Sequence, residues 1–464
     1  MALQYDTPTS SADFSSAINN NVAISAATAA AISSLLGLDT ATTVNVAGWD
    51  GVTAPVTTGS PDVLAITVDG AAGDEAKLVL PESVADAKVI LIDSDADVSL
   101  TVGQEASSLA RVAAVSDIIV NGGNGNDTLT VLGGGNVTLD GGLGNDVLIT
   151  GSGDDVVTGG AGDDHIEAGA GNDTIVTGLG NDVILAGAGR DSIEVQGNLA
   201  DFDVSVKGSF LELGGDTNSV TIQGGEFVTF ADGHTIAIVE TEAEASALRL
   251  YEGLLGRDAD NGGAELFSNE INNGTSLTSI TESFLASTEY KNSVNDDFVQ
   301  GLYTSLLDRP ADAADQTFWL DQLASGKTQG EVAGEIAVSA EAQTKGQDNA
   351  SFIESLYDSA LGRATQGDDV SHWVGELIAG STRAEVAGQI FGSAEASHHA
   401  NVEFVESLYT NALGRPEGDV DAYKAEWVAS LDQGTTQADV AIAIVGSPEA
   451  QDHITNVVVV HGAV

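Results

Sequence analysis

The chain has 464 residues, of which 70 are Asp or Glu and only 15 are Lys or Arg, giving a formal net charge of −55 at pH 7. This charge argues against nucleic acid as a partner, because the phosphate backbone would be repelled. The sequence contains no cysteine, so disulfides, thiol nucleophiles and cysteine-rich zinc sites are excluded. We therefore expect stability to rest on apolar packing and on bound divalent cations.

The N-terminal segment, residues 1–39, is predicted to be helical. The first basic residue of the chain is Lys77, whereas a secretory signal places positive charge ahead of its apolar run. The stretch from Val22 to Leu38 is rich in Ala, Ser and Thr and is too short and polar to span a bilayer, so we expect a soluble helix. We expect export without a cleaved N-terminal signal and no membrane span.

Residues 40–121 are predicted to be a β-rich segment that leads into the next part of the chain. Short runs of β-branched and aliphatic residues, such as Val63 to Val68 and Val89 to Ile92, have the composition of strands.

Residues 122–194 repeat the pattern Gly-Gly-x-Gly-x-Asp-x-apolar-x. The glycines permit the positive φ of a tight turn and direct backbone carbonyls to one point, and the aspartate adds a carboxylate. One apolar side chain per repeat then points from a short strand into a core. A single turn cannot complete six to eight calcium ligands, so turns must stack with each ion between two neighbours. A flexible glycine-rich linker would not keep this phase.

The aspartates at the sixth repeat position are the candidate calcium ligands: Asp127, Asp146, Asp155, Asp164, Asp173, Asp182 and Asp191, the last six each nine residues apart. The apolar residues two positions later are the predicted core: Leu129, Leu148, Val157, Ile166, Ile175, Ile184 and Ile193. Stacking of the turns bounds the number of Ca²⁺ ions at about four to seven. Metal binding and folding should occur together.

Segments such as Gly141 to Asp146 and Gly159 to Asp164 resemble the RTX (repeats in toxin, hemolysin-type) nonapeptide family. The resemblance implies a calcium-loaded parallel β-roll in which alternate turns stack on one edge. It pairs Asp146 with Asp164, Asp155 with Asp173, Asp164 with Asp182, and Asp173 with Asp191. Between Val131 and Asp140 the repeat departs from the pattern and offers Asn136 nine residues after Asp127. The resemblance also implies Gram-negative type I secretion, with folding once the chain meets extracellular calcium.

Residues 195–244 are predicted to be a β-rich cap over the open end of the roll core. Within them, Gly224 to Gly233 resembles the segment that commonly follows RTX blocks.

Residues 245–455 contain four copies of a helical repeat of about 53 residues, marked by Tyr251, Tyr303, Tyr357 and Tyr409. The aromatic sixteen to eighteen residues after each tyrosine is predicted to lie in the core: Phe267, Trp319, Trp373 and Trp427. Capping boxes are expected at Thr328 and Thr382, with a variant at Thr436. Serines are expected to cap further helices: Ser287, Ser339, Ser393 and Ser447.

Each copy carries an arginine six residues after its tyrosine: Arg257, Arg309, Arg363 and Arg415. One hypothesis is that each guanidinium satisfies carbonyls at a helix end and pairs with a glutamate at the same repeat position. The proposed partners are Glu289, Glu341, Glu395 and Glu449. The alternative is an arginine row that binds anionic glycan, lipopolysaccharide or an alginate-like polymer. The segment resembles a helical domain of unknown function often joined to RTX blocks in secreted bacterial proteins, and that resemblance implies no activity.

The chain gives little indication of an enzyme. It lacks the His-Glu-x-x-His and Gly-x-Ser-x-Gly motifs of zinc proteases and lipases. His398 and His399 are adjacent, so on a helix they would not share a face, and His165 is expected to be exposed on the roll. We assign no catalytic residue and no organic cofactor. The apolar tail, residues 456–464, fits either the end of a C-terminal secretion signal or a buried final strand.

The sequence thus predicts a multidomain β-then-α protein, with a parallel β-roll flanked by β-rich segments and followed by an all-α repeat domain. The predicted role is that of a secreted calcium-binding, non-catalytic structural or adhesive protein of the bacterial cell surface or extracellular matrix, as in a surface layer, adhesion or biofilm. Its expected partners are calcium and either further copies of itself or an anionic cell-surface polysaccharide. The alternative is a secreted polysaccharide-binding or polysaccharide-modifying protein.

Overall fold

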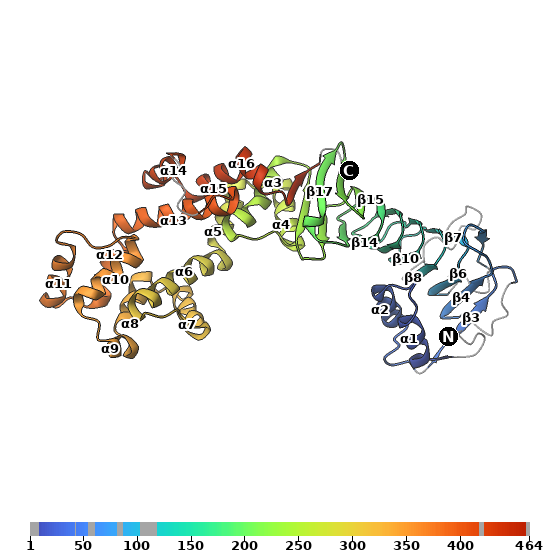
Figure 1. The fold of residues 1–464 in the computed structure, drawn as a ribbon, viewed down its shortest axis with the longest axis horizontal. Helices are drawn as coiled ribbons and strands as arrows, with labels where there is room; N and C mark the ends of the chain where they lie inside the picture. The colour runs from blue at the N-terminus through green and yellow to red at the C-terminus, as the bar shows by residue number, and fades with distance from the viewer. Residues whose placement is uncertain are drawn as a thin grey trace. The chain divides into compact units, whose positions relative to one another are not determined.

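The computed structural model describes residues 9–41, 43–53, 61–80, 87–102, 118–416 and 422–460. The chain divides into two units, one formed by residues 1–242 with 456–464 and the other by residues 243–455 (Figure 1). In the first unit two short helices precede a long series of strands, and the described part of the second unit is helical. The predicted order of β and then α is confirmed.

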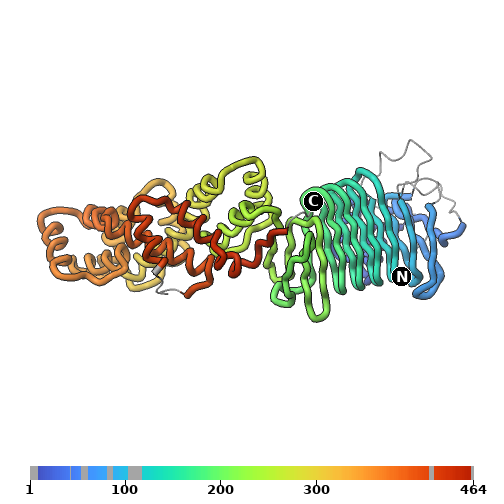
Figure 2. The backbone as a smooth tube through the Cα atoms, turned by 90° about the horizontal axis from the view of Figure 1, so that it is seen from above, coloured from blue at the N-terminus to red at the C-terminus, as the bar shows by residue number. Residues whose placement is uncertain are grey.

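Two large sheets make up most of the first unit, and Figure 2 shows their strands as a stack of coils. One sheet has the strand order β22-β21-β20-β16-β14-β12-β10-β8-β6-β4-β3, and the other has the order β17-β18-β19-β15-β13-β11-β9-β7-β5. From β4 to β16 successive strands alternate between the two sheets, so the backbone winds as a parallel roll.

The strands of the first sheet are β3 (Val46–Trp49), β4 (Val63–Val68), β6 (Val89–Ser94), β8 (Ile118–Gly123), β10 (Val137–Leu143), β12 (Val156–Ala161), β14 (Thr174–Leu179), β16 (Ser192–Val195), β20 (Phe227–Phe230), β21 (Thr235–Val239) and β22 (Val457–Val459). The strands of the second are β5 (Glu75–Leu78), β7 (Asp97–Val102), β9 (Thr128–Val131), β11 (Val147–Ile149), β13 (His165–Ala170), β15 (Asn181–Ala188), β17 (Phe202–Lys207), β18 (Phe210–Gly215) and β19 (Ser219–Gln223). A short 3-10 turn, η2 (Leu199–Asp201), precedes β17.

The core of the roll lies between the two sheets. All seven apolar residues predicted from the repeat are 0 % exposed there, which confirms that this repeat position points inward: Leu129, Leu148, Val157, Ile166, Ile175, Ile184 and Ile193. Each buried side chain of this size contributes about 1.5–3 kcal/mol relative to an exposed one. The register is parallel, with Leu148 opposite Ile166 and Val157 opposite Ile175.

The roll begins well before the nonapeptide repeats. The predicted strands near Val63 and Val89 are β4 and β6, which pair in parallel with each other, and β6 pairs with β8. After the repeats, β17, β18 and β19 form antiparallel pairs, as do β20 and β21. The chain end then returns as β22 and pairs in parallel with β21, and Val460 is buried. Within the apolar tail, Val457–Val459 thus form a partly buried strand, Val460 after it is buried, and 461–464 lie outside the described residues.

The helix predicted for Val22 to Leu38 is present but shorter than that stretch, and a break separates it from an earlier helix. The structure has α1 (Ser11–Asn19) and α2 (Ala26–Leu35), while β1 (Thr9–Ser10) pairs with β2 (Thr43–Val44). The break arises because the Ser25 side chain accepts a hydrogen bond from the Thr28 amide and so starts α2 afresh, and Val22 is 86 % exposed. The Ser25 amide in turn donates to Asp140 Oδ2 of the roll.

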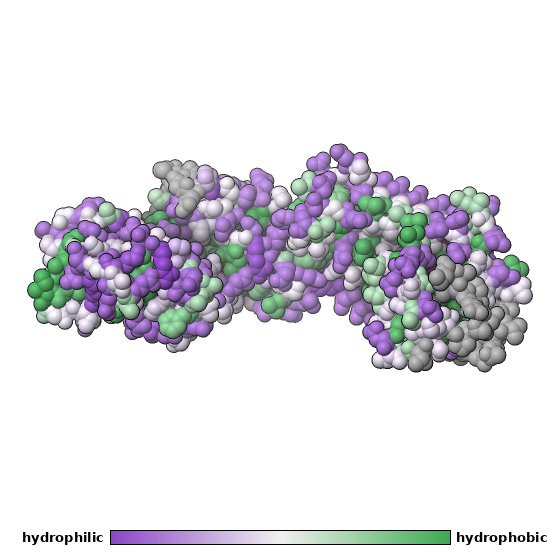
Figure 3. Space-filling view, turned by 60° about the horizontal axis from the view of Figure 1, so that its bottom comes forward, coloured by the Kyte–Doolittle hydropathy of each residue, from purple (hydrophilic) through white to green (hydrophobic). Residues whose placement is uncertain are grey.

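The helical unit contains α3 (Glu242–Leu250), the π-helical η3 (Tyr251–Leu255), α4 (Asn261–Asn272), α5 (Leu277–Ala286), α6 (Thr288–Leu307), α7 (Ala313–Ala324), α8 (Gln329–Ala337), α9 (Ala340–Lys345), α10 (Asn349–Leu361), α11 (Asp369–Ala379), α12 (Arg383–Phe391), α13 (Ala394–Leu413), α14 (Ala422–Asp432), α15 (Gln437–Val445) and α16 (Pro448–His453). Across the described residues, none of these helices is long and apolar enough to cross a membrane. Hydrophilic residues cover most of the face seen in Figure 3.

The four repeats pack in pairs, the second with the third and the first with the fourth. In the inner pair α6 packs on α10 and α8 on α12, and in the outer pair η3 packs on α13 and α5 on α15. Ser305 and Ser359, which follow their tyrosines by the same two residues, share a hydrogen bond of 2.7 Å between their hydroxyls. A contact between equivalent residues indicates a local two-fold relation. Gly330 and Gly388 allow α8 and α12 to approach closely.

The predicted helix starts are confirmed. Capping boxes are present at Thr328 and Thr382, Thr436 accepts from the Asp439 amide, and each predicted serine caps its helix: Ser287, Ser339, Ser393 and Ser447. The aromatic positions are less uniform than predicted, because only Trp319 is buried and Phe267, Trp373 and Trp427 are half-buried. The indole nitrogen of Trp319 in α7 donates to the Tyr303 hydroxyl in α6, so this hydrogen bond joins the two helices.

Candidate calcium sites

The nonapeptide turns are shaped by glycines that no other residue could replace. Gly160 has a φ of +109° and Gly162 a φ of +134°, in the region that L side chains rarely adopt. A Cβ on Gly160 would lie well under 3.0 Å from the carbonyl oxygen of Gly142, which is eighteen residues earlier. The turns on one edge therefore stack backbone against backbone.

The repeat aspartates form a ladder along each edge. In the last four aspartates of the series, one carboxylate oxygen accepts a hydrogen bond from the amide of the aspartate eighteen residues earlier. The distances are 2.8 Å from Asp146 N to Asp164 Oδ1, 2.8 Å from Asp155 N to Asp173 Oδ1, 3.0 Å from Asp164 N to Asp182 Oδ1 and 2.8 Å from Asp173 N to Asp191 Oδ1. The structure thus places together the four pairs implied by the resemblance.

The other carboxylate oxygen, Oδ2, is what makes these ladders candidate metal sites. Among the described residues, Oδ2 is buried without a hydrogen-bond partner in all seven predicted ligands: Asp127, Asp146, Asp155, Asp164, Asp173, Asp182 and Asp191. None of these residues is more than 2 % exposed. A buried carboxylate without a partner is costly, so each Oδ2 requires either a proton or a cation.

Backbone carbonyls face the same spaces as these free oxygens. The point that a Cβ on Gly141 would occupy is within 3.0 Å of both Asp146 Oδ2 and the carbonyl oxygen of Gly159. The corresponding point at Gly159 is within 3.0 Å of Asp164 Oδ2 and the carbonyl of Thr177. In the described part of the chain no three acidic or histidine side chains gather in one cluster, so carbonyls must supply much of the coordination. An oxygen-only ligand set of this kind suits Ca²⁺.

A second ladder, which sequence reasoning missed, runs through the residue before each aspartate. Asp163 N donates to Asn145 Oδ1 and Asn181 N to Asp163 Oδ1, so these hydrogen bonds run in the opposite direction to those of the aspartates. The signal was present as an Asn or Asp at repeat position five. Asn136 belongs to this ladder, because it accepts from the Asp154 amide, and Val137 donates to Asp155 Oδ1 in the place of an aspartate.

We expect the affinity of the roll for calcium to fall as the pH is lowered from about 8 to about 6. Burial raises the pKa of Asp146 and Asp173 to about 7 and that of Asp164 to about 8 in the ion-free roll. Protonation therefore stabilises the ion-free fold at low pH, and that stabilisation is lost as the pH rises through about 7. Calcium binds the ionised form, so protons compete with it, and one unit of pKa corresponds to about tenfold.

The measurement is a calcium titration at both pH values in which bound calcium is counted by equilibrium dialysis, because a folding signal would also report the protonated ion-free roll. The midpoint should be at least about tenfold higher at pH 6 than at pH 8, since each ion needs an ionised carboxylate. Equal midpoints would contradict competition between protons and calcium at these aspartates.

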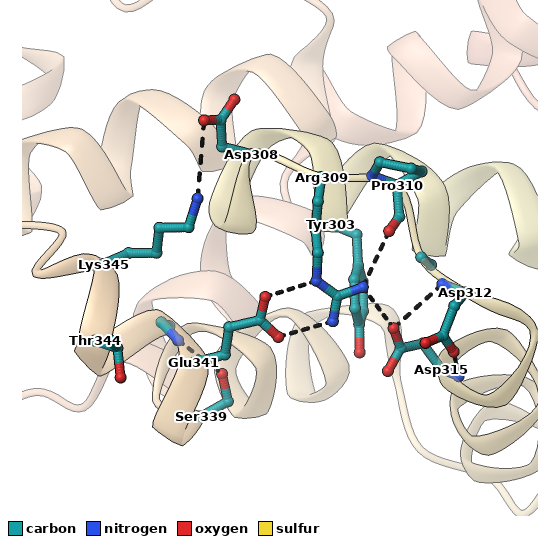
Figure 4. A network of polar contacts seen from close by, with 12 residues as sticks. Tyr303, Asp308, Arg309, Pro310, Asp312, Asp315, Ser339, Glu341, Thr344 and Lys345 are labelled. Atoms are coloured by element: carbon teal, nitrogen blue, oxygen red, sulfur yellow. Dashed lines mark hydrogen bonds and ion pairs between the residues drawn. The ribbon is translucent and has the colours of Figure 1, made fainter.

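The arginines of the helical unit are the second set of candidate site residues. Figure 4 shows Arg309 at the end of α6, where Nε and Nη2 donate to the two carboxylate oxygens of Glu341 at 2.6 and 2.7 Å. Nη1 donates to Asp315 and to the carbonyl of Pro310, and the guanidinium lies 4.8 Å from the Tyr303 ring centre. The hypothesis of arginine–glutamate pairs is confirmed in every copy: Arg257 with Glu289, Arg309 with Glu341, Arg363 with Glu395 and Arg415 with Glu449.

These pairs occupy the donors that an anionic polymer would need. Each guanidinium makes a fork-shaped contact with its glutamate. Among the described residues, Arg257, Arg309 and Arg363 also contact an aspartate: Asp260, Asp315 and Asp369. The histidines likewise serve local contacts, since His165 lies beside Glu167 and His398 beside Asp432.

Comparison with known families agrees with this geometry. Residues 121–157 and 158–193 match the model of the RTX calcium-binding nonapeptide repeat. Residues 243–294, 281–346, 333–400 and 397–454 match the model described as Domain of unknown function (DUF4214). The chain thus carries calcium-binding RTX repeats followed by four copies of that domain. The searches of curated proteins and of solved structures gave no match.

Proposed function

We propose that this RTX-repeat chain is a secreted, non-catalytic structural or adhesive protein of the cell surface or extracellular matrix, which folds when it binds calcium. The observation that carries the proposal is the ladder of buried aspartates, each with one oxygen that has no hydrogen-bond partner. Without cations, the buried carboxylate charges of this ladder would strongly destabilise the fold. Bound cations would compensate those charges and stabilise it. Asp127, Asp146, Asp155, Asp164, Asp173, Asp182 and Asp191 would hold the ions, about four to seven in number.

Export would then be coupled to folding. In a cytosol poor in calcium the roll would stay unfolded, and extracellular calcium would fold it by mass action. RTX repeats are typical of secreted proteins, and type I export from a Gram-negative cell without a cleaved N-terminal signal is the route that we propose.

A structural role fits the rest of the molecule better than catalysis does. The interior of the roll is filled by aliphatic side chains, and the arginines of the helical unit are paired within the chain. Sequence motifs for a zinc protease or a serine hydrolase are missing. The net charge of −55 would keep copies apart until divalent cations bridge them.

The test is light scattering on the purified full chain while calcium is raised from chelator to about 10 mM, above the affinity range of extracellular calcium modules. We expect the mass to grow after the roll has folded, and magnesium at equal concentration not to substitute. In parallel, the calcium-loaded protein is passed over an anionic polysaccharide column. Retention there without growth in mass would favour a polysaccharide-binding protein. A protein that shows no growth in mass and no retention would contradict the structural role.

A further inference from the structure

The two edges of the roll end differently after the last nonapeptide turn. On one edge Asp182 pairs with Val220 in the register of β15 and β19, so the next coil has no carboxylate at this position. On the other edge Ser192 pairs with Phe227 in the register of β16 and β20. Glu226 directly precedes Phe227, just as Asp191 directly precedes Ser192. It therefore occupies the place of a repeat aspartate, although it lies outside the matched repeats.

Glu226 also makes the contact that a repeat aspartate makes. The Asp191 amide donates to Glu226 Oε2 at 2.6 Å, as the Asp173 amide donates to Asp191 Oδ1 at 2.8 Å. The turn before it stacks in the same way, because Gly224 has a φ of +77° and a Cβ there would lie 2.9 Å from the carbonyl oxygen of Gly187. The three residues Gly224 to Glu226 are thus a shortened continuation of the ladder.

Asp191 supplies an independent sign that a ligand belongs here. The residue is 0 % exposed, and its Oδ2 has no hydrogen-bond partner. Its Oδ1 is turned to the preceding coil, where it accepts from Asp173 N. In the equivalent arrangement at Asp146, Oδ2 lies near the carbonyl of Gly159 in the following coil. For Asp191 the following coil is the one that carries Glu226.

We propose that Asp191 and Glu226 form a further calcium site that joins the last nonapeptide turn to the cap on this edge only. The proposal rests on the calcium-filled ladder of the proposed function and extends it by one site. Two carboxylates supply oxygen ligands of the kind that a hard divalent cation prefers. On the opposite edge, Val220 stands where a second carboxylate would be needed, so the space between Asp182 and the next coil has only the Asp182 carboxylate.

The test compares Glu226→Gln with Glu194→Gln in the full chain. E226Q keeps an oxygen that can accept from the Asp191 amide but removes the charge. Glu194 is an exposed glutamate on the same strand as Ser192. Bound calcium is counted by equilibrium dialysis with radioactive calcium at saturation, and circular dichroism checks folding. We expect E226Q to bind about one ion fewer than the wild type and E194Q to bind the same number.

A second pair of variants keeps the proposal testable if E226Q fails to fold. Asp191 would contact ions on both of its sides, whereas Asp182 would share an ion with a second carboxylate on one side only. Asp191→Asn should therefore lose about two ions and Asp182→Asn about one. Equal losses in this pair, or an unchanged count in folded E226Q, would overturn the site and leave the calcium-folded roll standing. A wild-type chain that binds no calcium would overturn both proposals.

Discussion

Chelation of calcium at pH 8 is expected to unfold the roll and to leave the helical unit folded. At this pH the aspartates of the ion-free roll are driven to ionise, because burial raises the pKa of Asp127 and Asp191 only to about 7. A buried charge without a partner costs several kcal/mol even after relaxation. A ladder of such charges exceeds the net stability of a whole domain, which is about 5–15 kcal/mol.

The helical unit has no reason to respond in the same way. Its inner pair of repeats has its own apolar core, in which Phe352 and Leu356 are 0 % exposed. Its four repeat arginines are each paired with a glutamate, as in the contact of Arg309 with Glu341. Calcium should therefore be needed for the strands and dispensable for the helices.

Far-UV circular dichroism separates the two outcomes, because the helical minimum near 222 nm should persist in chelator while the β contribution is lost. Hydrogen exchange then assigns the loss to residues 118–239. Magnesium serves as the control, since it demands a smaller octahedral shell and sheds its water reluctantly, and it should not restore the strands. Protected amides in the roll in chelator at pH 8 would contradict the account of the aspartate ladder.

The features that the sequence predicted correctly are those encoded over short distances. The phase of Asp164 and Ile166 repeats every nine residues, and stacking turns translate this phase directly into a buried core and a ladder of carboxylates. The helix starts at Thr328 and Thr382 were also predicted correctly, because a capping box needs only four consecutive residues.

The features that were missed depend on distant residues or on context. The pairing of the first repeat with the fourth is set by tertiary packing and has no local signature. Glu226 follows Asp191 by 35 residues, because an antiparallel insertion breaks the nine-residue spacing, and only the strand register shows that the two are neighbours. Trp373 was predicted to lie in the core but is half-buried. An aromatic residue at a repeat position does not show how completely other residues will cover its side chain.

The largest effect of a single substitution is expected for Gly178→Ala. Gly178 has a φ of +95°, and an added Cβ would lie well under 3.0 Å from the carbonyl oxygen of Gly160 in the preceding coil. Backbone atoms cannot swing aside as a flexible side chain can, so the two coils would have to separate. Separation would break neighbouring contacts, among them the hydrogen bond of 2.8 Å from Gly162 N to Leu179 O.

Gly233→Ala is the matched control, because Gly233 has a φ of +85° with no atom within 4 Å of the added Cβ. It carries the conformational strain alone, about 1–2 kcal/mol. In a calcium titration by circular dichroism, G233A should reach the folded signal at a moderately raised midpoint. G178A should gain no β signal up to about 10 mM calcium, beyond the range of extracellular modules. If both variants folded at the same midpoint, the close stacking of the turns would not be what the glycines are required for.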